Sequence, residues 1–149
     1  MRRIMTLGFA IAVVGCAGGE EMPADSPATA MAAPLTLADL AGTWSVQALA
    51  ETSDSVLTTY TLTATPDASG WTLTFPGRDP IPASVAVDGD SLIMDAGPYE
   101  SVLRAGEQVT IHGVSRLDNG MLMGTFMARY ATASADSVLR GRMHGTRMP

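Results

Sequence analysis

Residues 109–130 of the chain read VTIHGVSRLDNGMLMGTFMARY, and the pattern of this segment predicts a β-fold. Apolar and polar side chains alternate before Asn119-Gly120, and mostly apolar side chains follow it. This dipeptide is typical of the two-residue turn of a β-hairpin, because both turn positions favour a positive φ. The stretch therefore predicts two antiparallel strands, Val109–Leu117 and Met121–Tyr130, joined by a tight turn.

The same alternation, broken by short turn signals, extends in both directions from this hairpin. Asp88-Gly89 and the segment 66–70 (PDASG) separate further strands, and no stretch keeps the helical period of 3.6 over three turns. Only Leu37–Leu40 predicts a single helical turn, with Thr36 as its cap. The remaining predicted strands are Thr43–Leu49, Val56–Ala64, Trp71–Phe75, Ile81–Val87, Leu92–Asp95 and Val138–Arg147.

Eight strands with short hairpin loops predict an all-β domain built as an antiparallel meander. A meander of this length avoids exposed edges most simply by closing into an up-and-down barrel. Tyr99–Leu103 follows Gly97-Pro98 and could form a ninth strand. Because an odd number of strands cannot close with every pair antiparallel, we interpret it as a bent continuation of the fifth strand. The prediction is an eight-stranded up-and-down β-barrel over residues 35–149, with a flattened sandwich as the alternative.

The amino-terminal part of the chain has a different composition. Arg2 and Arg3 precede an apolar run of 11 residues, Ile4–Val14, so residues 1–15 predict a signal peptide. The run is too short for a membrane helix, which needs about 20 apolar residues. Residues 16–34 are poor in large apolar side chains and predict a disordered tether of about 18 residues, with a reach on the order of 20–25 Å.

The sequence Val13-Val14-Gly15-Cys16 resembles the lipobox of bacterial lipoproteins. In that family the Cys thiol is diacylated, the chain is cleaved before it and the new amino terminus is acylated. The resemblance implies lipid attachment at Cys16 and anchoring to a membrane through that lipid. Ala17 at the next position implies the outer membrane rather than the inner or plasma membrane. Cleavage would remove Arg2 and Arg3 and change the net charge from −6 to −8.

A second resemblance lies at the start of the predicted domain. Gly42-Thr43-Trp44, after one helical turn, is similar to the Gly-X-Trp opening of the lipocalin and wider calycin families. The resemblance implies a lipocalin-like barrel in which this Trp lies across one end of the core and an Arg of the last strand packs on it. The candidate partner of Trp44 is Arg147, with Arg142 second. The other lipocalin motifs and the lipocalin disulfide are missing from the chain.

The alternation also assigns an inward face to each strand. Eight strands enclose either a packed core or one small ligand. Inward glycines such as Gly113 and Gly141 are compatible with a cavity, or with a filled core in which they allow the strands to bend. The first functional hypothesis is a non-catalytic barrel that binds a small apolar or amphipathic molecule. Its candidate binding residues are Trp44, Tyr60, Leu62, Trp71, Leu73, Phe75 and Phe126.

The strand Met121–Tyr130 is apolar on both faces. Met121, Met123 and Met127 make its outer face, and unbranched methionine side chains suit adaptable contact surfaces. The alternative hypothesis is therefore a structural or interaction protein with a filled barrel, which uses this face for a protein partner or a homodimer. Cover by the loop Ala131–Ser137 or by the amino-terminal turn would instead give the face a purely structural role.

The composition argues against other classes of protein. The 149 residues are 46% hydrophobic and carry a net charge of −6, and all nine basic residues are arginines that form no run longer than the pair Arg2-Arg3, so we expect no nucleic-acid binding. Cys16 alone forms no internal disulfide. His112 and His144 lie far apart, so the sequence predicts no metal site, no cofactor and no enzymatic activity.

Overall fold

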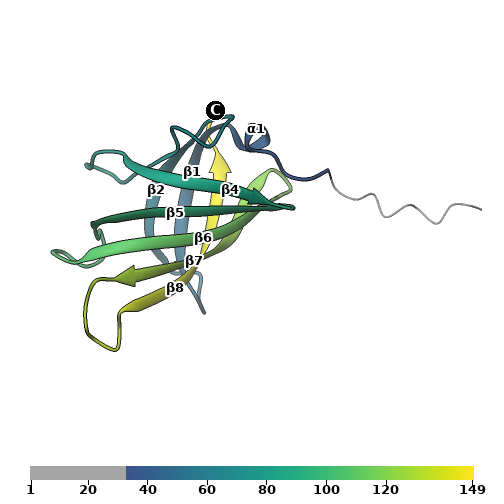
Figure 1. Ribbon diagram of the computed structural model, residues 1–149. Helices are drawn as coiled ribbons and strands as arrows, with labels where there is room; N and C mark the ends of the chain where they lie inside the picture. Colours follow the sequence, from purple (N-terminus) through teal and green to yellow (C-terminus); the bar gives the residue numbers. More distant parts are fainter. Residues whose placement is uncertain (1–32) are drawn as a thin grey trace, which may run out of the picture. The chain divides into compact units, whose positions relative to one another are not determined.

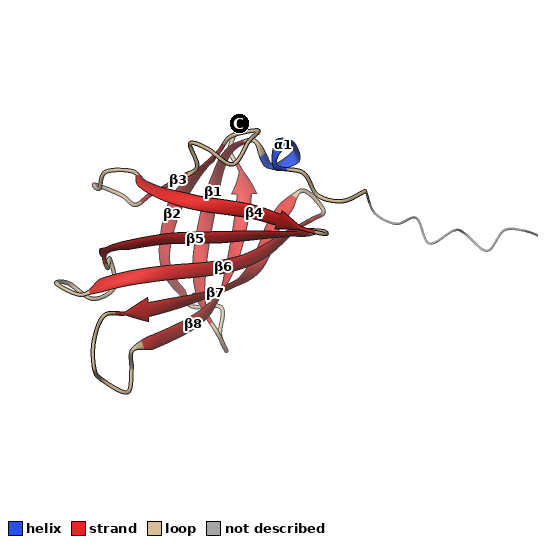
Figure 2. Cartoon of the chain, in the orientation of Figure 1, coloured by secondary structure: helices blue, strands red, loops and turns tan. Residues whose placement is uncertain are grey.

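The computed structural model describes residues 33–149, which form one antiparallel β-barrel with a single helical turn (Figures 1 and 2). The predicted signal peptide and almost all of the predicted tether lie outside the described residues. The elements are α1 (Leu37–Leu40), β1 (Gly42–Ala50), β2 (Val56–Ala64), β3 (Thr72–Thr74), β4 (Ile81–Asp88), β5 (Ser91–Glu100), β6 (Gln108–Asp118), β7 (Met121–Tyr130) and β8 (Val138–Arg147). The predicted all-β fold is confirmed.

Each strand pairs with the next one in the chain, and β8 pairs with β1. The β1–β8 register runs from Trp44 opposite Arg147 to Ala50 opposite Gly141. This pairing closes an eight-stranded up-and-down barrel, so neither strand keeps an unpaired edge. The closure excludes the flattened sandwich, in which β1 and β8 would lie apart. Among the described residues, no helix has the length and apolar character needed to cross a membrane.

Five strands differ from their predicted bounds. β1, β4 and β6 extend one residue further at one or both ends, whereas β3 is shorter at both ends and β5 is longer. β3 ends at Thr74 rather than Phe75, because the chain turns there and the Arg78 N–H donates to the Phe75 carbonyl at 3.1 Å. β5 continues past Gly97, which has a φ of +111°, and its register with β6 shifts between Ala96 and Tyr99.

The predicted continuation of the fifth strand is therefore right for Tyr99 and Glu100 but wrong for residues 101–103. The Ser101 hydroxyl accepts the N–H groups of Leu103 and Arg104, at 3.0 and 3.1 Å, and these bonds turn the chain out of the sheet.

One end of the barrel is closed by α1. Thr36 and Asp39 form a reciprocal capping box at its start, and Leu40 is buried. The Trp44 indole donates to the Leu40 carbonyl at 2.8 Å, and the Arg147 guanidinium lies 4.4 Å from the centre of the Trp44 ring system. Arg147 also donates to the carbonyls of Asp39 and Ala41. These contacts join α1, β1 and β8 into a plug.

The inward glycines do not leave empty space. A Cβ added at Gly141 would lie 2.5 Å from the Phe126 ring, and one added at Gly113 would lie 2.8 Å from the Met143 methyl group. Larger side chains of neighbouring strands therefore fill these positions. The barrel is packed around its glycines, and its cavity lies elsewhere.

Candidate functional site

The end of the barrel opposite α1 contains a small cavity. Its volume is about 40 Å³, and a single water molecule needs roughly 10–15 Å³ when volume is measured in the same way. The lining is mainly aromatic and aliphatic, with Ser101 and Thr58 as small polar groups. The lining residues are Ala48, Thr58, Tyr60, Leu73, Phe75, Tyr99, Ser101, Val102, Leu103, Val109, Ile111, Phe126, Ala128 and Tyr130.

Aromatic rings from three successive parts of the chain make one side of this cavity. The ring centroids of Tyr60 and Phe75 lie 5.3 Å apart, and those of Phe75 and Tyr99 lie 5.7 Å apart, both in tilted arrangements. Spacings of this kind are favourable beyond the burial of area. The rings therefore form a continuous apolar wall from β2 to β5.

The tyrosine hydroxyls bring polarity into this wall. Burial raises the pKa of Tyr60 well above its usual value, and burial raises the pKa of Tyr99 to about 12. No described residue forms a hydrogen bond with the hydroxyl of Tyr60, Tyr99 or Tyr130. Near neutral pH the hydroxyls of Tyr60 and Tyr99 therefore keep their protons, and they can donate to a polar group that enters the cavity.

Residues 101–107, here called the Ser101 loop, connect β5 to β6 and contribute Ser101, Val102 and Leu103 to the cavity wall. Ser101 is buried and holds the first turn of the loop through its hydroxyl. Its N–H donates to the Glu107 carbonyl at 2.8 Å, which brings the two ends of the loop together. The loop is thus a compact unit whose residues form part of the wall.

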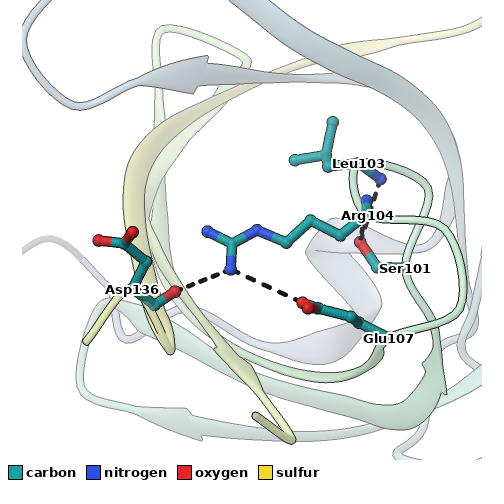
Figure 3. Close-up of polar contacts among 5 residues, drawn as sticks. All are labelled: Ser101, Leu103, Arg104, Glu107 and Asp136. Carbon is teal, nitrogen blue, oxygen red and sulfur yellow. Dashed lines mark hydrogen bonds and ion pairs between the residues drawn. The ribbon is translucent and has the colours of Figure 1, made fainter. Parts of the chain in front are cut away.

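Arg104 connects this loop to the β7–β8 loop, residues 131–137 (Figure 3). Its Nη1 donates to the Asp136 carbonyl at 2.8 Å, and its guanidinium carbon lies 4.0 Å from the centre of the Tyr130 ring. Glu107 Oε2 lies 3.7 Å from the same nitrogen and accepts no hydrogen bond. Arg78 of the β3–β4 loop adds a bond of 2.6 Å to the Glu100 carbonyl. Two arginines therefore hold the Ser101 loop region to neighbouring loops.

The structure separates the predicted binding residues into two groups. Tyr60, Leu73, Phe75 and Phe126 line the cavity. The other three, Trp44, Leu62 and Trp71, are not among its lining residues and are at most 1% exposed in the packed core. Trp44 instead contacts Arg147, the arginine that the lipocalin resemblance implies.

Sequence reasoning missed four lining residues that carry hydroxyl groups, namely Thr58, Tyr99, Ser101 and Tyr130. Tyr130 shares the inward face of β7 with Phe126, so the alternation could have identified it. Tyr99 and Ser101 follow the break at Gly97-Pro98, which hides the period of two.

The outward methionines lie where the alternation places them. Met121 is 40% exposed, and Met123 and Met127 are partly buried. The loop Ala131–Ser137 follows β7 and does not bury Met121. The described residues contain no group of three or more His, Cys, Asp or Glu side chains that could hold a metal ion.

Protein-family models, curated proteins and solved structures were each compared with the chain, and none of them matches it.

Proposed function

We propose that the barrel binds a small, mainly apolar molecule below the Ser101 loop without transforming it, and that a lipid on Cys16 holds the chain at a bacterial outer membrane. The observation that carries the binding role is the difference between the two ends of the barrel. The α1 end is packed and closed, whereas the opposite end has an aromatic cavity with tyrosine hydroxyls that no described residue engages.

The lining indicates the chemistry of the ligand. Tyr60, Phe75 and Phe126 offer ring faces to an apolar body, and the tyrosine hydroxyls can orient a single polar group. The cavity of about 40 Å³ accepts only a few atoms. An apolar cavity of about 150 Å³ is known to bind benzene, so an aromatic ring or short alkyl chain would enter only if the Ser101 loop moves outward.

The same lining favours binding over catalysis. It contains no His, Asp, Glu, Cys or Arg side chain. Its tyrosines Tyr60 and Tyr99 have raised pKa values, and the Ser101 hydroxyl already accepts two backbone N–H groups. No group in this wall can therefore act as a general base near neutral pH.

The anchoring part of the proposal rests on the sequence. Val13-Val14-Gly15-Cys16 follows a charged and then apolar segment at the spacing of a lipoprotein signal. Two or more acyl chains hold a protein stably at a membrane, whereas a single chain does so only weakly.

A fluorescence titration with N-phenyl-1-naphthylamine tests the binding role. Wild-type protein should bind the probe saturably, and Ala128→Leu, which fills the cavity, should weaken binding about tenfold. Ala86→Leu is the matched control, because Ala86 lies on the exposed face of β4 and should leave binding unchanged. Native mass spectrometry should also reveal any ligand that copurifies. Failure to bind the probe or other small apolar compounds, or binding that ignores Ala128→Leu, would contradict the proposal.

A further inference from the structure

Basic side chains gather on the outer face of β6, β7 and β8. The described residues contain seven arginines, and four of them point outward on these strands: Arg116, Arg129, Arg140 and Arg142. His112 and His144 lie on the same face. The chain as a whole has 15 acidic and 9 basic residues, so this face differs in sign from the rest of the molecule.

The cross-strand register arranges these side chains in three rows. One outer row is His112, Met127 and Arg140, and the other is Arg116, Met123 and His144. The row between them is Val114, Thr125 and Arg142. Successive rows on one face lie about 7 Å apart.

Val114 and Thr125, which form the middle row over β6 and β7, have shorter side chains than the His, Met and Arg residues of the outer rows. Two open grooves, of about 220 and 400 Å³, are both lined by Val114, Thr125 and Arg142, so they meet over the middle row. Together they form a furrow across the strands, here called the arginine–methionine furrow. Its floor is Val114 and Thr125, and its walls are the two outer rows.

Two of the cations in the walls form no ion pair among the described residues, although Glu51 also lines the groove beside Arg140. Arg116 and Arg140 have no carboxylate within 4.0 Å and donate no side-chain hydrogen bond to any described residue. Arg142, at the β8 end of the floor, is held instead by the Asp54 carboxylate at 2.9 Å and the Ser53 carbonyl at 2.8 Å. His112 pairs with Asp95 at 2.7 Å.

We infer that the arginine–methionine furrow binds an extended acidic segment of another protein. Carboxylates of such a segment would pair with Arg116 and Arg140, while alternate apolar side chains would contact Val114, Met123 and Met127. Arg116 and Arg140 lie two strands and two rows apart, which is roughly 16 Å between Cα atoms. About five residues of an extended chain cover that span.

Charge and shape favour this occupant over two others. A symmetric dimer through this face would bring two copies of Arg116 and Arg140 into the same interface and so concentrate like charge there. A flat anionic membrane would reach the walls but not the floor, where Val114 is 39% exposed. The furrow is on the outer wall, so the inference does not depend on ligand binding inside the barrel.

Fluorescence anisotropy with the purified full chain tests the inference. The probe is a labelled ten-residue peptide that alternates Glu with Val and Leu, and the control peptide has Lys in place of Glu. Arg116→Gln and Arg140→Gln should each raise the Kd about threefold, and the double variant about tenfold. Arg129→Gln is the matched control, because it removes the same charge from the same face one row outside the furrow. Its Kd should stay within about twofold of the wild type.

Circular dichroism of each variant separates loss of binding from loss of folding. The inference is overturned if the Glu peptide does not bind, if the Lys peptide binds equally well, or if Arg129→Gln acts as strongly as Arg116→Gln. Binding to phosphatidylglycerol vesicles that falls with Arg116→Gln, without peptide binding, would assign the face to a membrane. A dimer lost in the same variant would assign it to a second copy.

Discussion

Arg147 connects three elements at the closed end of the barrel. Its guanidinium stacks on Trp44 of β1 and donates to the carbonyls of Asp39 and Ala41, which lie at the end of α1. The last carbonyls of a helix have no partner within the helix, so these bonds satisfy groups that would otherwise need water. One side chain of β8 therefore keeps the helical turn in place over the core.

We expect Arg147→Ala to lower the free energy of unfolding by about 1–2 kcal/mol, because it removes a cation–π contact and two charge-assisted hydrogen bonds at a partly solvated site. Urea denaturation followed by tryptophan fluorescence measures the change. Arg129→Ala is the control, since Arg129 is exposed and makes no ion pair within the described residues, and its effect should stay within about 0.5 kcal/mol. Equal effects of the two substitutions would refute a structural role for Arg147.

At the scale of elements, the approach of β8 to its neighbours depends on glycine. The space next to Gly141 is bounded by the Leu49 carbonyl and by the Phe126 ring, and neither can withdraw without moving a strand or a core ring. The space next to Gly113 is bounded by the terminal methyl group of Met143, which can rotate away. A Cβ at position 113 should therefore be tolerated better than a Cβ at position 141.

Gly141→Ala should destabilise the barrel by about 2–3 kcal/mol through overpacking, whereas Gly113→Ala should cost about 1 kcal/mol or less. The thermal midpoint of unfolding, measured by circular dichroism, compares the two variants directly. A larger loss for Gly113→Ala would show that Met143 is held more rigidly than its contacts indicate.

The bounds of the strands also differ in how well the sequence predicts them. β7 and β8 have their predicted bounds because a period of two and clear turn signals such as Asn119-Gly120 coincide there. The bounds of β5 were not predictable, because the register shift at Gly97 interrupts the alternation, and the bonds that end the strand come from the Ser101 hydroxyl. Local pattern gives strands and faces, but not contacts between distant loops.

The residues of the candidate site also divide into those that a local pattern predicts and those that depend on contacts between distant parts of the chain. Tyr60, Leu73, Phe75 and Phe126 were accessible from alternation, since inward apolar positions are defined locally. Their separation from Trp44 was not, because it depends on which end of the barrel α1 closes. That choice is made by contacts between Arg147 and residues more than 100 positions earlier.

For the whole molecule, the buried tyrosines link stability to alkaline pH. The usual tyrosine pKa is 10.0, and burial raises that of Tyr99 to about 12 and also raises that of Tyr60. Below pH 10 both states keep these protons, so stability is unaffected. Above pH 10 the unfolded chain releases protons that the folded chain retains, so the free energy of unfolding falls as the pH rises toward 12.

We expect urea denaturation at intervals between pH 9 and 11.5 to give a steadily decreasing free energy of unfolding above pH 10. Tyr99→Phe and Tyr60→Phe should each make this decrease less steep. A slope identical to the wild type in both variants would contradict the assignment of the effect to these two rings.

The anchoring proposal concerns the whole chain and is tested at Cys16, which lies outside the described residues. Cys16→Ser should abolish incorporation of labelled palmitate, because serine has no thiol for the diacylglyceryl transfer. The variant barrel should keep its thermal midpoint, since residues 33–149 contain every contact of the core described above. A wild-type chain that takes up no label and remains in the soluble fraction would contradict both the anchor and the membrane location.

The pairing of β1 with β8 has a consequence for the order of events in folding. Trp44 pairs with Arg147, so the first strand must wait for about 100 later residues before its second edge is covered. A nascent chain can form the hairpins from β1 to β7 and still expose two open strand edges, which can capture other chains. We therefore expect the β1–β8 pairing, which protects the molecule from self-association, to form last, and substitutions in β8 to affect yield during synthesis more than equal substitutions in β4.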